Sequence, residues 1–583
     1  MSRCRDDSQQ QQLYEAATIW REERGREAGA MFEYAFDHGV ASGDPSADGA
    51  VLWTRVTHRR SEAAEAVTLR WTVLKEDSGD EVASGEGLAT QERDWTFKVV
   101  VDGLDSGTAF TYQFHAAGDA SASPVGAFKT LPAAGVHVDQ LRYGIFSCSN
   151  WGWGYFNAYD AASRLGLDFA VHLGDYYYEY GSGHYPSVEE AVRWEGLEPR
   201  TELLTLADYR KRHALTRRDS SLQRLTSRTA LIAIWDDHEV ANNQFTGGAE
   251  NHQPETEGSF EARRAAAVQA YHEWLPTRPP EEAAAYYRTF TFGDLASMLV
   301  LETRMLNRTD PDELPSLMDT TAAKLAAMGP KGEDVFALGR EAEAELAAWR
   351  EELDAYRSRP DKSLLSSAEL RWVEDQTRAA REAGQTWTIF AQQIVMADLR
   401  FADFEGAVRA ARARGEAELA REWDSQVRNA TCSAEGTGKP LARSYAPTAY
   451  LADEFLQLQE LSQGECLGGR SGFVHGKYGI PFNLDQWSGY LAERERFFEA
   501  VARANDAKGG HENALVVYSG DSHNAWASDL RRGRGEQGPA AGDVVAAEYG
   551  VTSVSSTGFE SFMRFVSPEL VTAGFEAANP DLV

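Results

Sequence analysis

The chain has 583 residues, too many for one ordinary hydrophobic core, so the sequence predicts two domains or one large domain with an appendage. Hydrophobic residues make up 43% and charged residues 25%, which excludes intrinsic disorder, and no apolar run approaches the roughly 20 residues of a membrane helix. The net charge of −32 excludes general binding to nucleic-acid backbones, unless a local basic groove is present.

The first part of the chain divides into two segments. Residues 1–35 are polar and rich in Glu, Arg and Gln, which predicts an exposed extension, and they lack the apolar core of a signal peptide. From 36 to 135 the pattern changes to short alternating runs separated by turn residues. Runs of this length and spacing predict a small Ig-like or fibronectin-like β-sandwich with a structural role.

Residues 136–583 alternate strand-like with helix-like segments, which predicts an α/β (α+β) catalytic domain with crossover helices. Helices are expected over 206–213 and 219–225, before the strand at Ile232, and over 261–274. The continuous apolar run 296–301 predicts a buried strand.

The stretch 400–475 is predicted to be an insertion that forms a lid or rim over the site. It contains Cys432 and Cys466, which form either one disulfide, in an oxidising compartment, or two free thiols. Of the two remaining cysteines, Cys4 lies in the polar extension and Cys148 follows a strand-like run.

Four apolar runs in the catalytic region each end in side chains that can bind metal ions. The runs cover 141–146, 169–173, 231–235 and 514–518, and they lead to Cys148, to Asp175, to Asp237, and to Asp521 with His523. A single Gly-Asp after a strand is as often a turn or a helix cap, but four runs with one pattern predict a single site on one edge of a sheet. Gly174 lets the backbone turn tightly, so Asp175 is placed to bridge two cations.

The order of these blocks resembles that of the calcineurin-like metallophosphoesterases and, more closely, that of the PhoD-like alkaline phosphatase (alkaline phosphatase D) family. The resemblance covers nearly the whole chain, and its motifs together are highly specific. It is carried by Cys148 and by the segments 39–45 (GVASGDP), 52–55 (LWTR), 172–180 (HLGDYYYEY), 235–239 (WDDHE) and 520–523 (GDSH). It implies a metallophosphoesterase sandwich preceded by the Ig-like domain.

The resemblance also implies a metal pair, ferric iron (Fe3+) with calcium (Ca2+), and it selects Tyr178 among the neighbouring tyrosines as a ligand. A phenol with an ordinary pKa of about 10, like a thiolate at Cys148, favours ferric iron over calcium. The carboxylates of Asp175 and Asp237, with Asn242, suit calcium, a hard ion that prefers oxygen. Zinc or manganese (Zn2+ or Mn2+) is the alternative metal assignment. The alternative for Cys148 is that it is a small buried hydrophobic residue and binds no metal.

Catalytic or supporting roles are predicted for three further residues in or near these motifs. His238 directly follows Asp237, and it is expected to protonate the leaving group, with its ring oriented by a nearby carboxylate. Asn242 is expected to donate to phosphate oxygens. His172 lies inside the apolar run and is expected to be a core or supporting histidine rather than a ligand.

The expected function is metal-dependent hydrolysis of phosphate esters by a metal-activated hydroxide, with release of phosphate and without a phosphoenzyme. The substrate is a small-molecule or lipid phosphate ester, so a phospholipase D-like activity on lipid head groups is an alternative, favoured if the 400–475 insertion exposes apolar residues. A non-catalytic protein with a structural metal site is the alternative from another class. The resemblance implies a periplasmic or secreted enzyme.

Overall fold

The computed structural model describes ten parts of the chain, and all residues of the expected site lie within them. These parts are residues 33–59, 65–193, 196–278, 287–311, 340–432, 479, 481–505, 513–533, 543–558 and 566–583. The predictions for Cys4, for the side chains of Cys432 and Cys466, for most of the N-terminal extension and for most of the 400–475 insertion lie outside the described residues.

The first of two large sheets contains the runs that lead to Cys148, Asp175 and Asp237. Its strands follow the order β10 (Tyr143–Phe146), β11 (Phe169–His172), β12 (Leu231–Ala233), β2 (Val40–Gly43), β3 (Ala50–Arg55) and β7 (Thr96–Val101). The pairs from β10 to β2 are parallel, and β3 and β7 are antiparallel to their neighbours.

The second large sheet contains the fourth run. Its strands follow the order β13 (Arg288–Phe292), β14 (Ala296–Val300), β15 (Trp387–Ala391), β16 (Ala514–Ser519), β18 (Asp543–Gly550) and β17 (Trp526–Arg532). The strands from β14 to β18 are parallel, and β13 and β17 run antiparallel at the edges. All five residues of β14 are buried, as its continuous apolar run predicts.

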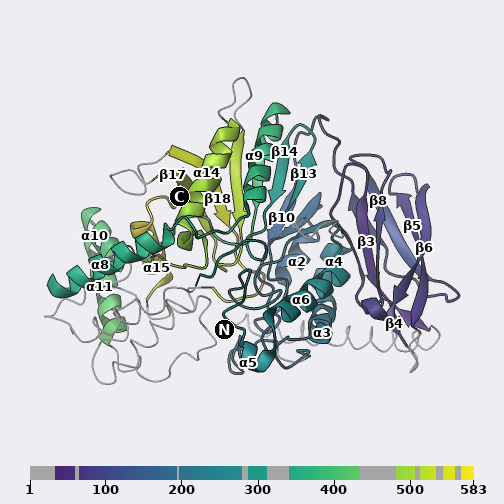
Figure 1. Ribbon diagram of the computed structural model, residues 1–583, viewed down its shortest axis with the longest axis horizontal. Coiled ribbons are helices and arrows are strands. Elements are labelled where there is room, and N and C mark those ends of the chain that lie inside the picture. The colour runs from purple at the N-terminus through teal and green to yellow at the C-terminus, as the bar shows by residue number, and fades with distance from the viewer. Residues whose placement is uncertain are drawn as a thin grey trace, which may run out of the picture.

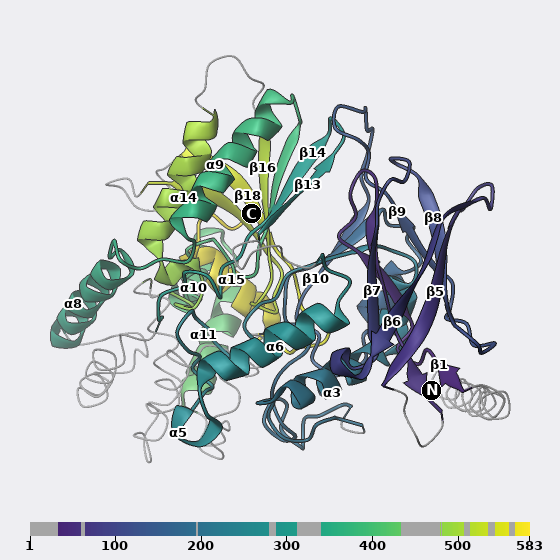
Figure 2. The ribbon, with the colours of Figure 1, turned by 45° about the vertical axis from the view of Figure 1, so that its right-hand side comes forward.

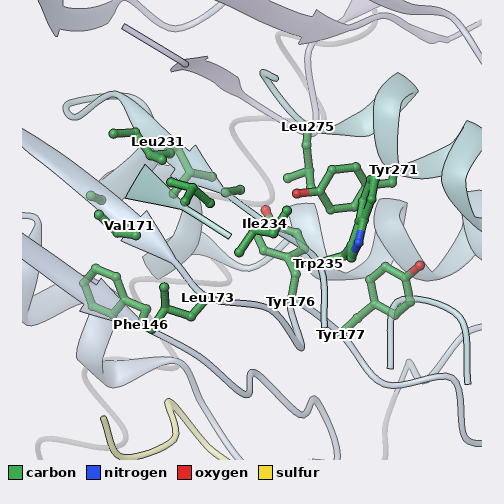
Figure 3. Packing of buried hydrophobic residues seen from close by; sticks show 14 of the residues in the cluster. Phe146, Val171, Leu173, Tyr176, Tyr177, Leu231, Ile234, Trp235, Tyr271 and Leu275 are labelled. Carbon is green, nitrogen blue, oxygen red and sulfur yellow. The ribbon is translucent and has the colours of Figure 1, made fainter. Parts of the chain in front are cut away.

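The two large sheets pack face to face around one apolar core. Phe169 of β11 stacks on Phe292 of β13 with ring centroids 4.7 Å apart. The same cluster continues with Val171, Leu231 and Trp235, whose side chains lie close together in Figure 3. Because this core holds the strands of both sheets, it also fixes the loops that leave their carboxyl ends.

Helices cover the outer faces of both sheets, which gives a layered α/β arrangement (Figures 1 and 2). Those on the first sheet are α2 (Asn157–Ala162), α3 (Leu206–Arg217), α4 (Ser220–Thr226) and α6 (Phe260–Trp274), and those on the second are α9 (Ser367–Glu382) and α14 (Leu491–Asn505). The predicted helices at 206–213, 219–225 and 261–274 are therefore confirmed. A capping box of Thr205 and Asp208 starts α3, and the Asp219 side chain caps α4.

The remaining helical segments lie outside these layers. They are η1 (Gln91–Arg93), α5 (Pro254–Glu257), α8 (Arg340–Arg357), α10 (Phe404–Ala413), α11 (Ala417–Cys432), η4 (Trp487–Gly489) and α15 (Pro568–Ala578). In the part of the chain that the structure describes, no helix has the length and apolar character required to cross a membrane.

The N-terminal strands form a sandwich of their own. Its outer sheet follows the order β6 (Glu81–Thr90), β5 (Ala66–Lys75), β8 (Ala109–Ala116) and β9 (Gly126–Lys129), and the short pair β1 (Tyr34–Ala35) and β4 (Thr57–His58) lies beside it. This sheet packs on β2, β3 and β7 through a separate core that includes Leu52, Leu69 and Phe110. Two packed sheets match the sequence prediction, and the Ig-like topology stays a prediction.

The N-terminal strands are continuous with the first large sheet, which the sequence did not predict. Strand β2 pairs with β12 at a single register position, Gly43 with Leu231, and the backbone N–H of Asp44 donates to the Leu231 carbonyl at 3.0 Å. A Cβ at Gly43 would lie 2.4 Å from the Pro276 carbonyl oxygen and 2.5 Å from that of Leu231. This close contact of backbones explains why the position is glycine.

We expect Gly43→Ala to lower the free energy of unfolding by about 1–3 kcal/mol, the usual cost of overpacking, because neither carbonyl can move without disturbing its strand or loop. Gly247→Ala is the matched control, since the nearest atom to its added Cβ is a ring carbon of Phe245 at 3.3 Å. Thermal denaturation of both variants is the measurement. Equal melting temperatures for the two variants would contradict the close packing at Gly43.

Candidate metal centre

The candidate site lies where the carboxyl ends of both sheets meet. The loops after β10 and β11 are joined by the backbone hydrogen bond from Ser149 to Asp175, at 2.7 Å, and Val554 in the second half donates to the Ser147 carbonyl at 2.9 Å. The prediction of one sheet edge is therefore wrong, because β16 belongs to the second sheet. The fourth run still reaches the site, since the two sheets face each other and their strand ends converge.

The loops at this junction approach as closely as backbones can. A Cβ at Gly174 would lie 2.3 Å from the Cβ of Asp236, so only glycine fits between the loops after β11 and β12. Four residues of the site hold the left-handed backbone region, with positive φ: Cys148 (63°), Asp175 (55°), Asp521 (61°) and His523 (61°). Such conformations cost free energy in residues other than glycine, and they cluster at functional sites.

The expected metal ligands come together at this junction. Among the described residues, three groups have all their ligand atoms within 4.8 Å of one another: Cys148, Asp175 and His523; Asp175, Asp237 and His238; and Asp236, Asp237 and Asp521. Asp175 and Asp237 each belong to two groups, and the bridging role of Asp175 stays a prediction. The Tyr178 hydroxyl lies 2.8 Å from Nε2 of His523, which adds the phenol to the first group.

The first group combines sulfur, nitrogen and phenolic oxygen. Cys148 is fully buried, and burial together with the nearby Asp175 carboxylate raises the pKa of its thiol well above the usual value. Burial and Asp175 raise the pKa of Tyr178 in the same way, while burial lowers the pKa of His523 to about 4. A neutral imidazole is ready to bind a cation, whereas the thiol and phenol lose their protons only with a strong Lewis acid nearby.

The carboxyl groups of the second and third groups differ in pKa. Burial raises the pKa of Asp175 well above its usual value, and it raises that of Asp521 to about 6 although Arg304 opposes the shift. Burial also opposes ionisation of Asp237, but His238 and Arg304 lower its pKa to about 2. Oδ1 of Asp175 is buried and accepts no hydrogen bond within the described residues. A buried, unpartnered carboxylate oxygen among sulfur, nitrogen and oxygen donors fits a bound cation.

Glu239 fixes the loops that carry these ligands. Its carboxylate accepts hydrogen bonds from the backbone N–H groups of Asp175 at 3.1 Å, Tyr176 at 2.6 Å and Asp236 at 2.7 Å. Burial raises its pKa to about 7, against these three hydrogen bonds. One side chain thus connects the ends of β11 and β12, a role that the sequence analysis did not give it.

His238 has the carboxylate partner that the sequence predicts, and that partner is Glu179. Nδ1 of His238 lies 2.7 Å from Oε2 of Glu179, which leaves Nε2 as the nitrogen for a substrate. Burial opposes its protonation, but Asp237, Glu179 and Asp175 together raise the pKa of His238 well above the usual value. These three carboxylates therefore favour the protonated form of the ring.

Asn242 lies beside the candidate centre, and its donation to phosphate stays a prediction. Its side-chain amide donates to Glu250 at 3.1 Å, and its backbone N–H donates to Glu179 at 2.8 Å. The neighbouring Asn243, with a left-handed φ of 51°, donates its backbone N–H to Oδ2 of Asp237 at 2.6 Å. One N–H of the Asn242 amide is therefore used by Glu250, and the second remains for a substrate.

His172 is a core histidine, as expected. Its Nε2 lies 2.8 Å from the Tyr159 hydroxyl, and the Gly174 backbone N–H donates to Nδ1 at 3.3 Å. Burial lowers its pKa to about 3, so the ring is neutral.

Arg304 is the main residue that the sequence analysis missed. Its guanidinium is fully buried and pairs with Asp236 at 2.5 Å, with Asp485 at 2.6 Å and with Asp521 at 3.2 Å. A longer contact of 3.8 Å reaches Asp237. The signal for it was present, because Arg304 follows the buried strand β14 just as the ligands follow theirs.

Comparison with known proteins places this geometry in a family. Residues 143–583 match the family model of the PhoD-like phosphatase, and residues 23–132 match that of the PhoD-like phosphatase N-terminal domain. Alkaline phosphatase D of Bacillus subtilis (strain 168) is 29% identical over 537 residues, which cover 90% of this chain and 70% of that protein. A solved structure of PhoD is similar with a TM-score of 0.63 and 27% identity, covering 94% of this chain and 82% of that chain.

We expect Arg304→Met to lower the free energy of unfolding by about 3–5 kcal/mol, because it leaves buried carboxylates without the guanidinium that pairs with them. Arg359→Met is the matched control, since Arg359 is 41% exposed in its pair with Asp361, and exposed pairs contribute about 0–1 kcal/mol. Thermal denaturation of both variants tests the difference. If Arg304→Met were as stable as the control, the buried network would not need its arginine.

Proposed function

We propose metal-dependent hydrolysis of phosphate esters for this chain, which belongs to the PhoD-like phosphatase family. Membership makes it an alkaline phosphatase-type hydrolase, and it argues against the non-catalytic alternative. The observation that carries the metal dependence is the convergence of Cys148, Tyr178 and His523 with a carboxylate group around the unpartnered Oδ1 of Asp175. The layered pair of sheets supports assignment to the metallophosphoesterase sandwich.

The residues divide into two kinds of metal position. Cys148, Tyr178 and His523, with Asp175, suit ferric iron, and the carboxylates of Asp175, Asp237 and Asp521 suit calcium; zinc or manganese is the alternative. When bound, the cations supply Lewis acidity and an activated water for attack on phosphorus. The protein holds the donors rigidly, because their loops are fixed by Glu239 and by the contacts between the two sheets.

His238 supplies the proton that the leaving group needs. When water adds to phosphorus and the ester P–O bond breaks, the leaving oxygen takes the bonding electron pair and a proton from Nε2 of His238. Glu179, hydrogen-bonded to Nδ1, holds the ring and stabilises its charged form. Arg304 acts by positioning, since its guanidinium is engaged by carboxylates and not directed at a substrate.

The chemistry at the centre is common to monoesters and diesters, so the proposal covers both. The lipid alternative gains no support from residues 400–427, the part of the insertion whose side chains the structure describes, because none of the exposed large hydrophobic side chains lies there. Export to the periplasm or medium stays a prediction from the family resemblance.

We expect purified protein to hydrolyse nitrophenyl phosphate or bis-nitrophenyl phosphate, and we expect chelation to abolish the turnover. Asp175→Asn is expected to reduce turnover by more than about 100-fold, since loss of even an outer partner of a metal site costs roughly 10–100-fold. Asp375→Asn, at an exposed carboxylate of α9 paired with Arg378, is the matched control. An active Asp175→Asn protein, or turnover that resists chelation, would contradict the proposal.

Tyr178→Phe tests the ferric assignment separately. Phenolate bound to ferric iron absorbs visible light by charge transfer, so we expect the phenolate band of the iron-loaded protein to be lost in this variant, while absorption from the Cys148 thiolate remains. Tyr176→Phe is the control, because its ring packs on His172 and His213 rather than among the ligands. Unchanged colour in Tyr178→Phe would refute its role as a ligand.

A further inference from the structure

A cluster of aromatic rings extends from the candidate metal ligands toward the protein surface. We call it the aromatic wall, and it consists of Tyr178, Tyr185, Tyr180 and Trp153. Tyr185 contacts the other three, with ring centroids 5.6 Å from Tyr178, 5.7 Å from Tyr180 and 5.5 Å from Trp153. Tyr178 and Tyr185 are buried, whereas Tyr180 and Trp153 are partly exposed. The outer two rings have no part in the hydrolysis proposed above.

The wall lies beside the proposed proton donor. The ring centroid of His238, the proposed proton donor, is 4.1 Å from Tyr178 and 5.4 Å from Tyr180. A leaving oxygen that takes its proton from His238 therefore lies near the rings of Tyr178 and Tyr180. The other partly exposed ring, Trp153, packs on the same Tyr185 as Tyr180 does.

The wall is held in place by its surroundings. Oδ1 of Asn150 accepts from the Gly152 backbone N–H at 2.9 Å, and Nδ2 of Asn150 donates to the Tyr185 carbonyl at 3.2 Å. Arg212 donates to the carbonyl oxygens of Tyr178 and Tyr180 from the other side. A rigid aromatic surface binds with little loss of side-chain entropy.

The charges around the wall restrict what it can bind. Two carboxylates lie near the wall: Glu179, next to Tyr180 in the chain, is 2.7 Å from Nδ1 of His238, and Glu250 accepts from the side chains of Asn242 at 3.1 Å and Asn243 at 2.6 Å. An additional anionic group on the substrate would be repelled there. A neutral group with a flat, apolar face is the chemistry that fits aromatic rings in this setting.

We propose that Tyr180 and Trp153 form a leaving-group subsite, which makes this enzyme selective for phosphate esters whose leaving group is a neutral, ring-bearing alcohol or phenol. The subsite rests on the proposed function, because the position of His238 defines the leaving side. Tyr180 and Trp153 bind the ring while the phosphoryl group occupies the centre.

The test compares two monoesters, 4-nitrophenyl phosphate and methyl phosphate, with release of inorganic phosphate as the common readout. The variants are Tyr180→Ala, Trp153→Ala and Tyr180→Phe. For each alanine variant we expect kcat/KM for the aryl ester to fall about tenfold more than that for the methyl ester, the size expected for loss of one stacking ring. Tyr180→Phe, which keeps the ring, should retain the aryl preference. Tyr549→Ala removes an exposed ring of β18 and serves as the control.

Three results would overturn the subsite. An equal loss on both esters would mean that the rings only position His238, and no loss on either ester would mean that they do not contact the substrate. Absence of turnover of both esters by the unsubstituted protein would refute the proposed function and the subsite with it. Trp153→Ala is a second test of the subsite if Tyr180→Ala fails to fold, because Trp153 is partly exposed and packs on Tyr185 rather than in the hydrophobic core of either sheet.

Discussion

The structure depends on a solution to one electrostatic problem, the burial of many carboxylates at one place. Among the described residues six acidic side chains of this region are nearly inaccessible to water: Asp175, Glu179, Asp236, Asp237, Glu239 and Asp485. Transfer of so many charges out of water is unfavourable unless each gains a partner. The chain supplies partners of three kinds, the guanidinium of Arg304, the imidazolium of His238 and the backbone N–H groups that point at Glu239. Oδ1 of Asp175 has none of these, which makes it the natural position for a cation.

The backbone at the site is held in unfavourable conformations by the sheets behind it. Cys148, Asp175, Asp521 and His523 all have positive φ. Their loops leave strands whose core is shared by both sheets, and the packing of Phe169 on Phe292 is part of that core. The apolar core therefore supplies the free energy that keeps the ligands in strained positions, which is a common relation between a scaffold and a reactive centre.

Much of this arrangement could be predicted from the sequence, because short-range patterns determine it. The strand runs that end at Phe146, His172 and Ser519 are continuous apolar segments, and the polar residues after them mark the site. The partition of those strands between two sheets was not predictable in this way, since a single run gives no information on which strand it pairs with. Arg304 and Glu239 were missed for the same reason, because their partners lie on other loops and become apparent only in the folded chain. The metal-binding roles of the ligands stay predictions.

The long sequence separations within the site also link cation binding to folding. Tyr178 and His523 are 345 residues apart, and Arg304 and Asp521 are 217 residues apart, so these groups meet only after both sheets have packed. In the unfolded chain the carboxylates are separated and solvated, so their affinity for a cation is low. A cation that binds the folded state alone stabilises it by about 2.7 kcal/mol at roughly 100 times its dissociation constant. Under the proposed metal assignment, the residues that prepare the chemistry would also make folding responsive to the cation.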